Sequence, residues 1–179
     1  KSVNGGTNWN LQFYDYSIDY LKSVNFVNAT TGWAVGYGGT ILKTTNSGTD
    51  WVNQNSGTNQ ILNSVYFIDE NNGWIVGNGS TILKTTNGGN DWINSLPGIP
   101  IYFLSSVVFN DHSNGWIVGY ADIILKTSDG GLNWSSQPVG FSDYYSVCFT
   151  DSNIGWMSGF GGAILKTIDG GITWHNKPS

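Results

Sequence analysis

The stretch Gly32-Trp33-Ala34-Val35-Gly36, followed by Ile41-Leu42-Lys43-Thr44 and closed by Trp51, carries most of the fold information in this chain. The same order of residues returns three more times, and residues 1–9 match the end of a fifth copy. A period of about 40 residues is typical of solenoids, propellers and repeat arrays. We place the copies at residues 1–9 (partial), 10–51, 52–92, 93–134 and 135–174.

Composition agrees with many short strands joined by tight turns. Glycine makes up 25 of the 179 residues, and charged residues are only 11% where about a quarter is typical. All seven basic residues are lysine, and a net charge of −5 without a basic cluster argues against nucleic-acid binding. The single cysteine, Cys148, excludes an internal disulfide framework and a cysteine zinc site, and we expect it to be buried in a strand.

One repeat predicts four strands. In the second copy, residues 62–67 are rich in β-formers, and residues 74–77 and 81–85 follow after short turns. A fourth strand is expected around Trp92. Strands separated by two to five turn residues form hairpins, so each repeat is predicted to be a four-stranded antiparallel sheet in an all-β chain.

The spacing between motifs favours a β-propeller. The interval from the repeat phenylalanine to the next glycine is six residues in every copy, and two further intervals are eight residues throughout. Only the link from the closing tryptophan to the next Ser-Val pair varies, between 12 and 14 residues. Radially packed blades need a constant internal geometry and tolerate variable crossovers, which leaves a β-solenoid of stacked hairpins as the second choice.

The turn before each closing tryptophan follows the pattern Ser/Thr-x-Asp/Asn-x-Gly-x-x-Trp. This pattern resembles the Asp-box, or BNR, repeat of sialidase-like propellers. Together with Gly-Trp-x-Val-Gly and Ile-Leu-Lys-Thr, it is similar to the propellers of the photosystem II stability/assembly-factor type and their bacterial secreted relatives. The resemblance implies a propeller of about four and a half blades. The assembly factors carry an arginine-rich patch, and this chain contains no arginine.

The Asp-box residues are assigned a structural role. An Asp or Asn side chain in a tight turn accepts hydrogen bonds from backbone N–H groups two residues on, and the glycine two positions later supplies a positive φ. We therefore expect no cofactor or metal at these turns. The residues in question are Asn4, Asn46, Asn87, Asp129 and Asp169.

Two enzyme classes were weighed. The resemblance implies that a sialidase holds its substrate carboxylate with three arginines, which this chain does not have. A two-carboxylate glycoside hydrolase stays open, with candidate acids Asp15, Asp19, Asp122 and Asp143. His112 and His175 stand in different repeats without the spacing of a metal site, so no catalytic residue or metal ligand is predicted.

Candidate binding residues lie where the copies differ. The turn between the second and third strands carries Tyr37, Tyr120 and Phe160 at one aligned position, with Asp122 in place of a small residue. This turn and the variable crossovers share one face of a propeller, and exposed aromatic side chains there suit a peptide or a sugar. The crossovers add Tyr14, Tyr16 and Tyr144 to the predicted site.

The last recurring feature is a lysine at the same strand position in each of the four copies. We expect these lysines to form a ring of solvated side chains that discourages the edges of β-sheets from pairing with one another. Their positions are Lys43, Lys84, Lys126 and Lys166.

Taken together, the residues predict a non-catalytic module that binds or scaffolds a protein or glycan, secreted or at a bacterial cell surface. The alternatives are a glycan-cleaving propeller and a structural subunit of a surface assembly. No apolar stretch is long enough to span a membrane, and the chain does not open with a signal-peptide pattern. Either further blades or the association of copies would continue the ring.

Overall fold

The computed structural model describes residues 1–12, 20–95, 103–137, 139, 140 and 142–176. These residues form short strands and two single turns of 3-10 helix, η1 (Tyr37–Gly39) and η2 (Phe160–Gly162), so the prediction of an all-β chain is confirmed. The first two repeats carry β1 (Leu21–Phe26), β2 (Gly32–Gly36), β3 (Ile41–Thr44), β4 (Val52–Gln54), β5 (Leu62–Phe67), β6 (Gly73–Gly77), β7 (Ile82–Thr85) and β8 (Ile93–Asn94). The next two carry β9 (Leu104–Phe109), β10 (Gly115–Gly119), β11 (Ile124–Thr127), β12 (Ser135–Ser136), β13 (Tyr144–Phe149), β14 (Gly155–Gly159), β15 (Ile164–Thr167) and β16 (His175–Asn176).

Each repeat folds into one antiparallel sheet whose four strands pair in sequence order. In every sheet the tryptophan of the second strand lies opposite the lysine of the third, as in the pair Trp74 and Lys84. The fourth strand begins directly after the closing tryptophan rather than around it. Each blade therefore extends two or three residues beyond that tryptophan.

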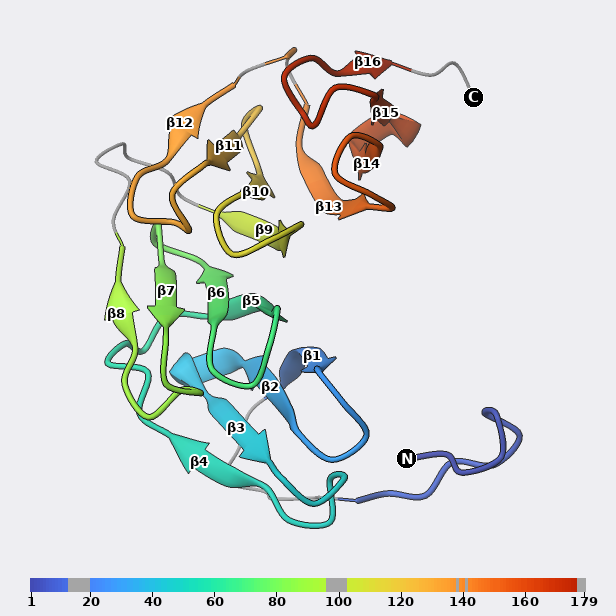
Figure 1. Cartoon of the computed structure of the whole chain (residues 1–179), viewed down its shortest axis with the longest axis vertical. Helices are drawn as coiled ribbons and strands as arrows, with labels where there is room; N and C mark the ends of the chain where they lie inside the picture. The colour runs from blue at the N-terminus through green and yellow to red at the C-terminus, as the bar shows by residue number, and fades with distance from the viewer. Residues whose placement is uncertain (13–19, 96–102, 138, 141, 177–179) are drawn as a thin grey trace.

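The four sheets stand side by side along an arc, as blades of a propeller (Figure 1). The first strands, β1, β5, β9 and β13, lie on the concave side, and each contacts the first strand of the next blade. The fourth strands lie on the outer rim. The arc runs from the β1–β4 blade to the β13–β16 blade.

Aromatic rings join each blade to the next. The indole of Trp33 stacks on Phe67 in the following blade, with ring centroids 3.5 Å apart and planes 6° apart. Gly73 leaves room for this phenylalanine, because a Cβ there would lie 2.5 Å from the Phe67 ring. Aromatic pairs add about 0.5–1.5 kcal/mol beyond the burial of their surface. The same contact recurs at the next two interfaces, as Trp74–Phe109 and Trp116–Phe149.

Side chains of the Asp box hold the turn between the third and fourth strands. The Thr127 hydroxyl accepts a hydrogen bond from the backbone N–H of Gly131 at 2.9 Å. Asp129 accepts from the N–H groups of Leu132 and Asn133 at 3.0 and 2.9 Å, three and four residues along rather than the expected two. The bond to the fourth residue recurs at Asn4, Asn46, Asn87 and Asp169.

All four aligned lysines are partly buried, and two of them bond the next blade rather than only solvent, which corrects the sequence expectation for these two. The ammonium groups of Lys43 and Lys126 donate to the carbonyls of Gly88 and Gly170 at 2.9 and 2.8 Å. Both acceptors belong to the Asp-box turn of the following blade. Burial lowers the pKa of Lys126, while the charge of Asp169 acts in the opposite direction. These lysines therefore tie neighbouring blades together.

Cys148 is exposed, against the expectation of a buried thiol. The aligned side chains of Asn25 and Tyr66 reach the following blade, where they bond the backbone of Phe67 and Phe109. This position therefore points out of the sheet toward the next blade. In the β13–β16 blade, none of the residues that the structure describes covers it.

Candidate functional site

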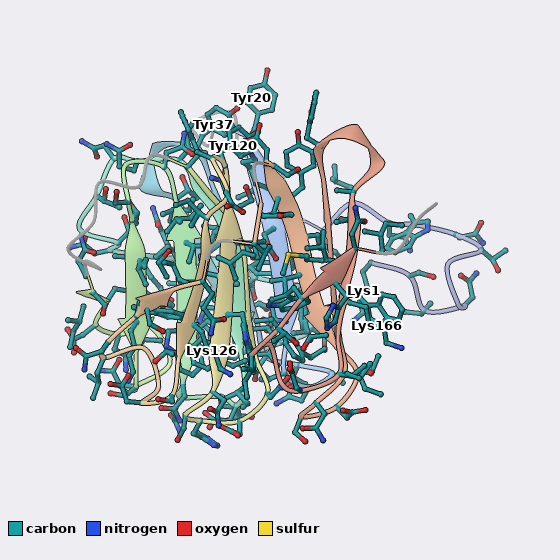
Figure 2. The ribbon with its side chains drawn as sticks, turned by 90° about the horizontal axis from the view of Figure 1, so that it is seen from above. Lys1, Tyr20, Tyr37, Tyr120, Lys126 and Lys166 are labelled. Carbon is teal, nitrogen blue, oxygen red and sulfur yellow. The ribbon has the colours of Figure 1, made fainter. Side chains whose placement is uncertain are left out.

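The turns between second and third strands gather at one edge of the blades, which we call the mouth edge. In each blade the first residue of this turn donates its backbone N–H to the carbonyl directly before the first strand, as Tyr37 does to Tyr20 at 3.0 Å. Asn78, Tyr120 and Phe160 make the equivalent bonds at 2.8–3.0 Å. Figure 2 shows Tyr20, Tyr37 and Tyr120 together at this edge, while Lys126 lies toward the opposite one.

A groove of about 380 Å³ crosses the mouth edge. Its size is within the range of small-ligand and peptide sites. All four blades contribute to it, through two kinds of position: the turn after the second strand and the beginning of the first strand. The lining residues are Lys22, Tyr37, Ile61, Asn63, Asn78, Phe103, Ser105, Tyr120 and Tyr145.

Aromatic contacts fix the walls of the groove. The Tyr120 ring lies 5.5 Å from Phe103 and 5.8 Å from Tyr145, measured between ring centroids. Tyr37 packs edge-on against Tyr20 at 5.5 Å. The rings of Tyr37 and Tyr120 both line the groove. Each hydroxyl can donate or accept a hydrogen bond toward a ligand.

An amide pair forms the floor. The Asn63 side-chain amide donates to the Asn78 carbonyl oxygen at 2.9 Å and to the backbone carbonyl of Leu104 at 2.8 Å. These bonds hold the two asparagines in place and join the β5–β8 and β9–β12 blades. An amide has both donors and acceptors, so this floor can match the backbone of a peptide or the hydroxyls of a sugar.

Lys22 supplies the one charge in the lining, with its ammonium group 5.8 Å from the centre of the Tyr37 ring. No carboxylate lines the described groove. Asp143 lies nearby, but its side chain accepts from the backbone N–H of Ala121 at 2.9 Å. Burial raises the pKa of Tyr145, and the charge of Asp143 raises it further. The groove is therefore an almost neutral surface.

Asp122 braces the crossover that enters the last blade. Its φ of 61° places a non-glycine residue in the left-handed region, and its carboxylate accepts from the N–H groups of Val139 and Gly140 at 3.1–3.3 Å. Tyr144 is 2% exposed and packs in the core between its blade and the preceding one. Burial first, and then the adjacent Asp122, raise the pKa of the Tyr144 phenol.

The structure brings some of the predicted binding residues together in the groove and places others elsewhere. Tyr37 and Tyr120 line the groove, whereas Tyr144 belongs to the core and does not reach the mouth surface as we had expected. Phe160 is 68% exposed on its turn but does not line the groove. Tyr14 and Tyr16 lie outside the described residues.

Sequence reasoning missed one series of groove residues. Each directly precedes the serine of the Ser-Val pair in the first strand, and in three of the four blades it follows a buried residue. Every copy carries a different side chain here while its neighbours recur, and this variation is the signal that could have found the series. The four residues are Lys22, Asn63, Ser105 and Tyr145.

The candidate acids and histidines of the sequence analysis have the following places in the structure. Of the candidate acids, Asp15 and Asp19 are not described, and Asp122 and Asp143 are engaged by backbone N–H groups. The described residues contain no cluster of three potential metal ligands. His112 instead pairs with Asp69 of the preceding blade at 2.7 Å, in the turns between first and second strands. The helical turns span three residues each, so no helix of the described chain could cross a bilayer.

Comparison with protein families matches residues 52–142 to the model described as Photosynthesis system II assembly factor YCF48. This region is just over half of the chain. No curated protein matches the sequence.

Solved structures share the fold at low sequence identity. "YCF48 bound to D1 peptide" is 18% identical with a TM-score of 0.59, and the alignment covers 88% of this chain and 82% of that one. YCF48 from Cyanidioschyzon merolae is 17% identical with a TM-score of 0.54, covering 88% and 85%. The GH74 enzyme of Niastella koreensis is 20% identical with a TM-score of 0.70, covering 87% of this chain but only 30% of the enzyme. These likenesses establish the propeller fold.

Proposed function

This chain belongs to the photosynthesis system II assembly factor YCF48 family, and we propose on that premise that it is a non-catalytic module whose groove at the mouth edge binds an extended segment of a partner protein. The observation that carries the proposal is the lining of the groove. It comes from equivalent positions in four successive blades, and it consists of aromatic and amide side chains.

A row of equivalent positions suits a linear ligand. Packed sheets lie about 10 Å apart, and an extended chain advances about 3.3 Å per residue. Each blade would therefore face about three residues of a bound peptide. Tyr37 and Tyr120 supply large contact surfaces with few rotamers to lose, and the amides of Asn63 and Asn78 can pair with peptide groups.

Charge narrows the class of peptide. The whole chain carries a net charge of −5, and Lys22 is the one charge in the groove lining. A strongly acidic segment would be repelled by the protein as a whole, and a strongly basic one would meet no carboxylate in the groove. We propose a segment that is largely uncharged and contains apolar side chains. The related YCF48 structure with a D1 peptide supports binding of a peptide as the shared activity.

The test uses an array of synthetic peptides that includes the D1 peptide, with affinities then measured by calorimetry. Tyr37→Ala and Tyr120→Ala should each weaken the best binder about tenfold, which corresponds to about 1.4 kcal/mol. Leu132→Ala is the matched control, because this residue is 69% exposed in an Asp-box turn at the opposite edge. Equal losses in all three variants, or no peptide bound at all, would overturn the proposal.

A glycan is the second candidate, favoured by the exposed tyrosines of the groove and by the fold shared with GH74 enzymes. Xyloglucan and cellulose oligosaccharides therefore form a second arm of the calorimetric test. Binding of a sugar that is lost in Tyr120→Ala, with no peptide bound, would replace the first proposal by the second. Because the groove lining includes no carboxylate, we propose that such a sugar would be bound and not cleaved.

A further inference from the structure

A β-bulge interrupts the first strand of each blade at the residue that lines the groove. In the β5–β8 blade, Leu62 and Ser64 pair with two adjacent residues of β6, so Asn63 is an extra residue between them. A bulge bends its strand and re-aims a side chain, and bulges are over-represented beside functional sites. The extra residues of the four blades all line the groove, and they are Lys22, Asn63, Ser105 and Tyr145.

The bulge residue of the β5–β8 blade, which packs between two other blades, has a fixed orientation. Both hydrogens of the Asn63 amide nitrogen are engaged, by the side-chain oxygen of Asn78 at 2.9 Å and by the Leu104 carbonyl at 2.8 Å. Turning the Asn63 amide by 180° would place its oxygen against these two oxygens, which repel it. Toward a ligand, Asn63 can therefore only accept a hydrogen bond, through Oδ1.

Asn78 has the complementary orientation. Its Oδ1 accepts from Asn63, so its Nδ2, with two donor hydrogens, lies on the other side of the amide. The main chain of Asn78 is held as well, because its N–H donates to the Ile61 carbonyl at 2.9 Å and its carbonyl accepts from the Thr81 hydroxyl at 2.7 Å. The pair therefore presents an acceptor on Asn63 and a donor on Asn78 in an arrangement that is fixed before a ligand binds.

We infer that Asn63 and Asn78 together bind the main chain of one residue of a peptide ligand, with Asn63 Oδ1 accepting from its N–H and Asn78 Nδ2 donating to its carbonyl. In an extended chain the N–H and C=O of one residue point to the same side, as in the residue pairs of an antiparallel sheet that exchange two hydrogen bonds. The two side chains thus act like one residue of a neighbouring strand. This inference rests on the proposed function and names the residues that make the groove select a peptide main chain.

The main chain is favoured over an amide side chain of the ligand. Every second residue of an extended peptide presents its N–H and C=O to the same side, so the match is available whatever the side chains are. An Asn or Gln side chain of the ligand would match the pair only at one place in its sequence, and it would lose rotamer freedom on binding. Because the pair is already held by hydrogen bonds, little of the cost of ordering falls on the protein.

The test places single esters in the main chain of the best-binding peptide, one position at a time, and measures each affinity by calorimetry. An ester replaces one main-chain N–H by an oxygen and leaves the side chains unchanged. Asn63→Ser introduces the residue that the next blade carries at its bulge, and Asn78→Asp keeps an acceptor for the Asn63 amide but removes the Nδ2 donors. Asn94→Asp is the control, since it makes the same change on the exposed outer strand of the same blade. Circular dichroism establishes that each variant is folded.

At one position the ester should weaken binding to the wild-type chain and to Asn94→Asp about tenfold, and binding to Asn63→Ser less than about twofold. Asn78→Asp should weaken the unmodified peptide about tenfold. If the peptide binds through Tyr37 and Tyr120 but the effect of no ester depends on Asn63, this inference is overturned while the proposed function stands. An affinity that follows an Asn or Gln side chain of the peptide, and no ester, has the same consequence. If no peptide binds, both fall.

Discussion

The Asp-box edge and the mouth edge of the blades differ in how uniform they are. At the Asp-box edge, five turns make the same bond from a glycine N–H to a Ser or Thr hydroxyl, at 2.7–2.9 Å. At the mouth edge, one blade has Gly38 and Gly39 in the left-handed region, whereas another has Ala121 and Asp122 there. The side chains that project from the mouth edge also differ in each copy.

The difference follows from what each edge contacts. Asp-box turns receive the tryptophan and lysine of the preceding blade, as when Trp74 donates to the Gly130 carbonyl at 3.0 Å. A change in one turn would disturb two blades. Side chains of the groove at the mouth edge make fewer such contacts, so they are free to vary and to serve a ligand.

The largest effect should come from Trp74→Ala, which removes a 1% exposed indole together with its stacking on Phe109 and its bond to the next turn. We expect a loss of about 3–5 kcal/mol in the free energy of unfolding, measured by urea titration. Trp9→Ala is the matched control, since this indole is 75% exposed and should cost little. Similar losses in both variants would contradict the role given to the stacked tryptophans.

A smaller loss is expected from Thr127→Val, which keeps the shape but removes the acceptor for the Gly131 N–H. Thr127 is 2% exposed, so the N–H would be left without a partner, at a cost of about 1–2 kcal/mol. Ser128→Ala changes an exposed hydroxyl of the same turn and should leave the urea midpoint unchanged. If the two variants unfold alike, the hydroxyl does not hold the turn.

Acid should weaken the Asp-box edge in particular. The backbone N–H and side-chain amide of Asn133, with the Thr127 hydroxyl, lower the pKa of Asp129 to about 2, and Thr173 lowers the pKa of Asp169 in the same way. A depressed pKa in the folded state gives stability above pH 4 that is lost as the pH falls toward 2. Urea midpoints across this range should decline for the wild-type chain.

Asp129→Asn should reduce that decline, because Asn46 and Asn87 already hold the same turn with an amide. The reverse change, Asn87→Asp, should destabilise the fold at neutral pH. It would replace the amide that donates to the Asp91 carboxylate at 2.9 Å by a second negative charge. A urea midpoint that falls more steeply with pH in Asp129→Asn than in the wild-type chain would contradict the stabilising role given to the ionised Asp129 carboxylate.

The smallest effect on stability is expected at the mouth edge. Tyr120 is 42% exposed and its ring contacts those of Phe103 and Tyr145, so Tyr120→Ala should lower the free energy of unfolding by about 0.5–1 kcal/mol. Urea titration checks this value beside the binding measurements. A loss comparable to that of Thr127→Val would mean that Tyr120 belongs to the scaffold.

Much of the fold was predictable because the repeat shows which residues must recur. The strands, the meander and the turns around Asn87 and Asp129 follow from local spacing. The inter-blade role of Lys43 and the exposure of Cys148 did not, because a strand pattern does not say which neighbour each face meets. Tyr120 was predictable from variation at an aligned turn, whereas Asn63 was overlooked within a strand.

The most direct test of the division between the two edges is a nuclear magnetic resonance titration of the chain with the best binder from the peptide array. Side-chain amide signals of Asn63 and Asn78 report on the groove, and the backbone N–H of Gly131 reports on the Asp-box edge. We predict saturable shifts at Asn63 and Asn78 with Gly131 unmoved. Shifts centred on Gly131 and the other Asp-box turns, with the groove unmoved, would contradict the account.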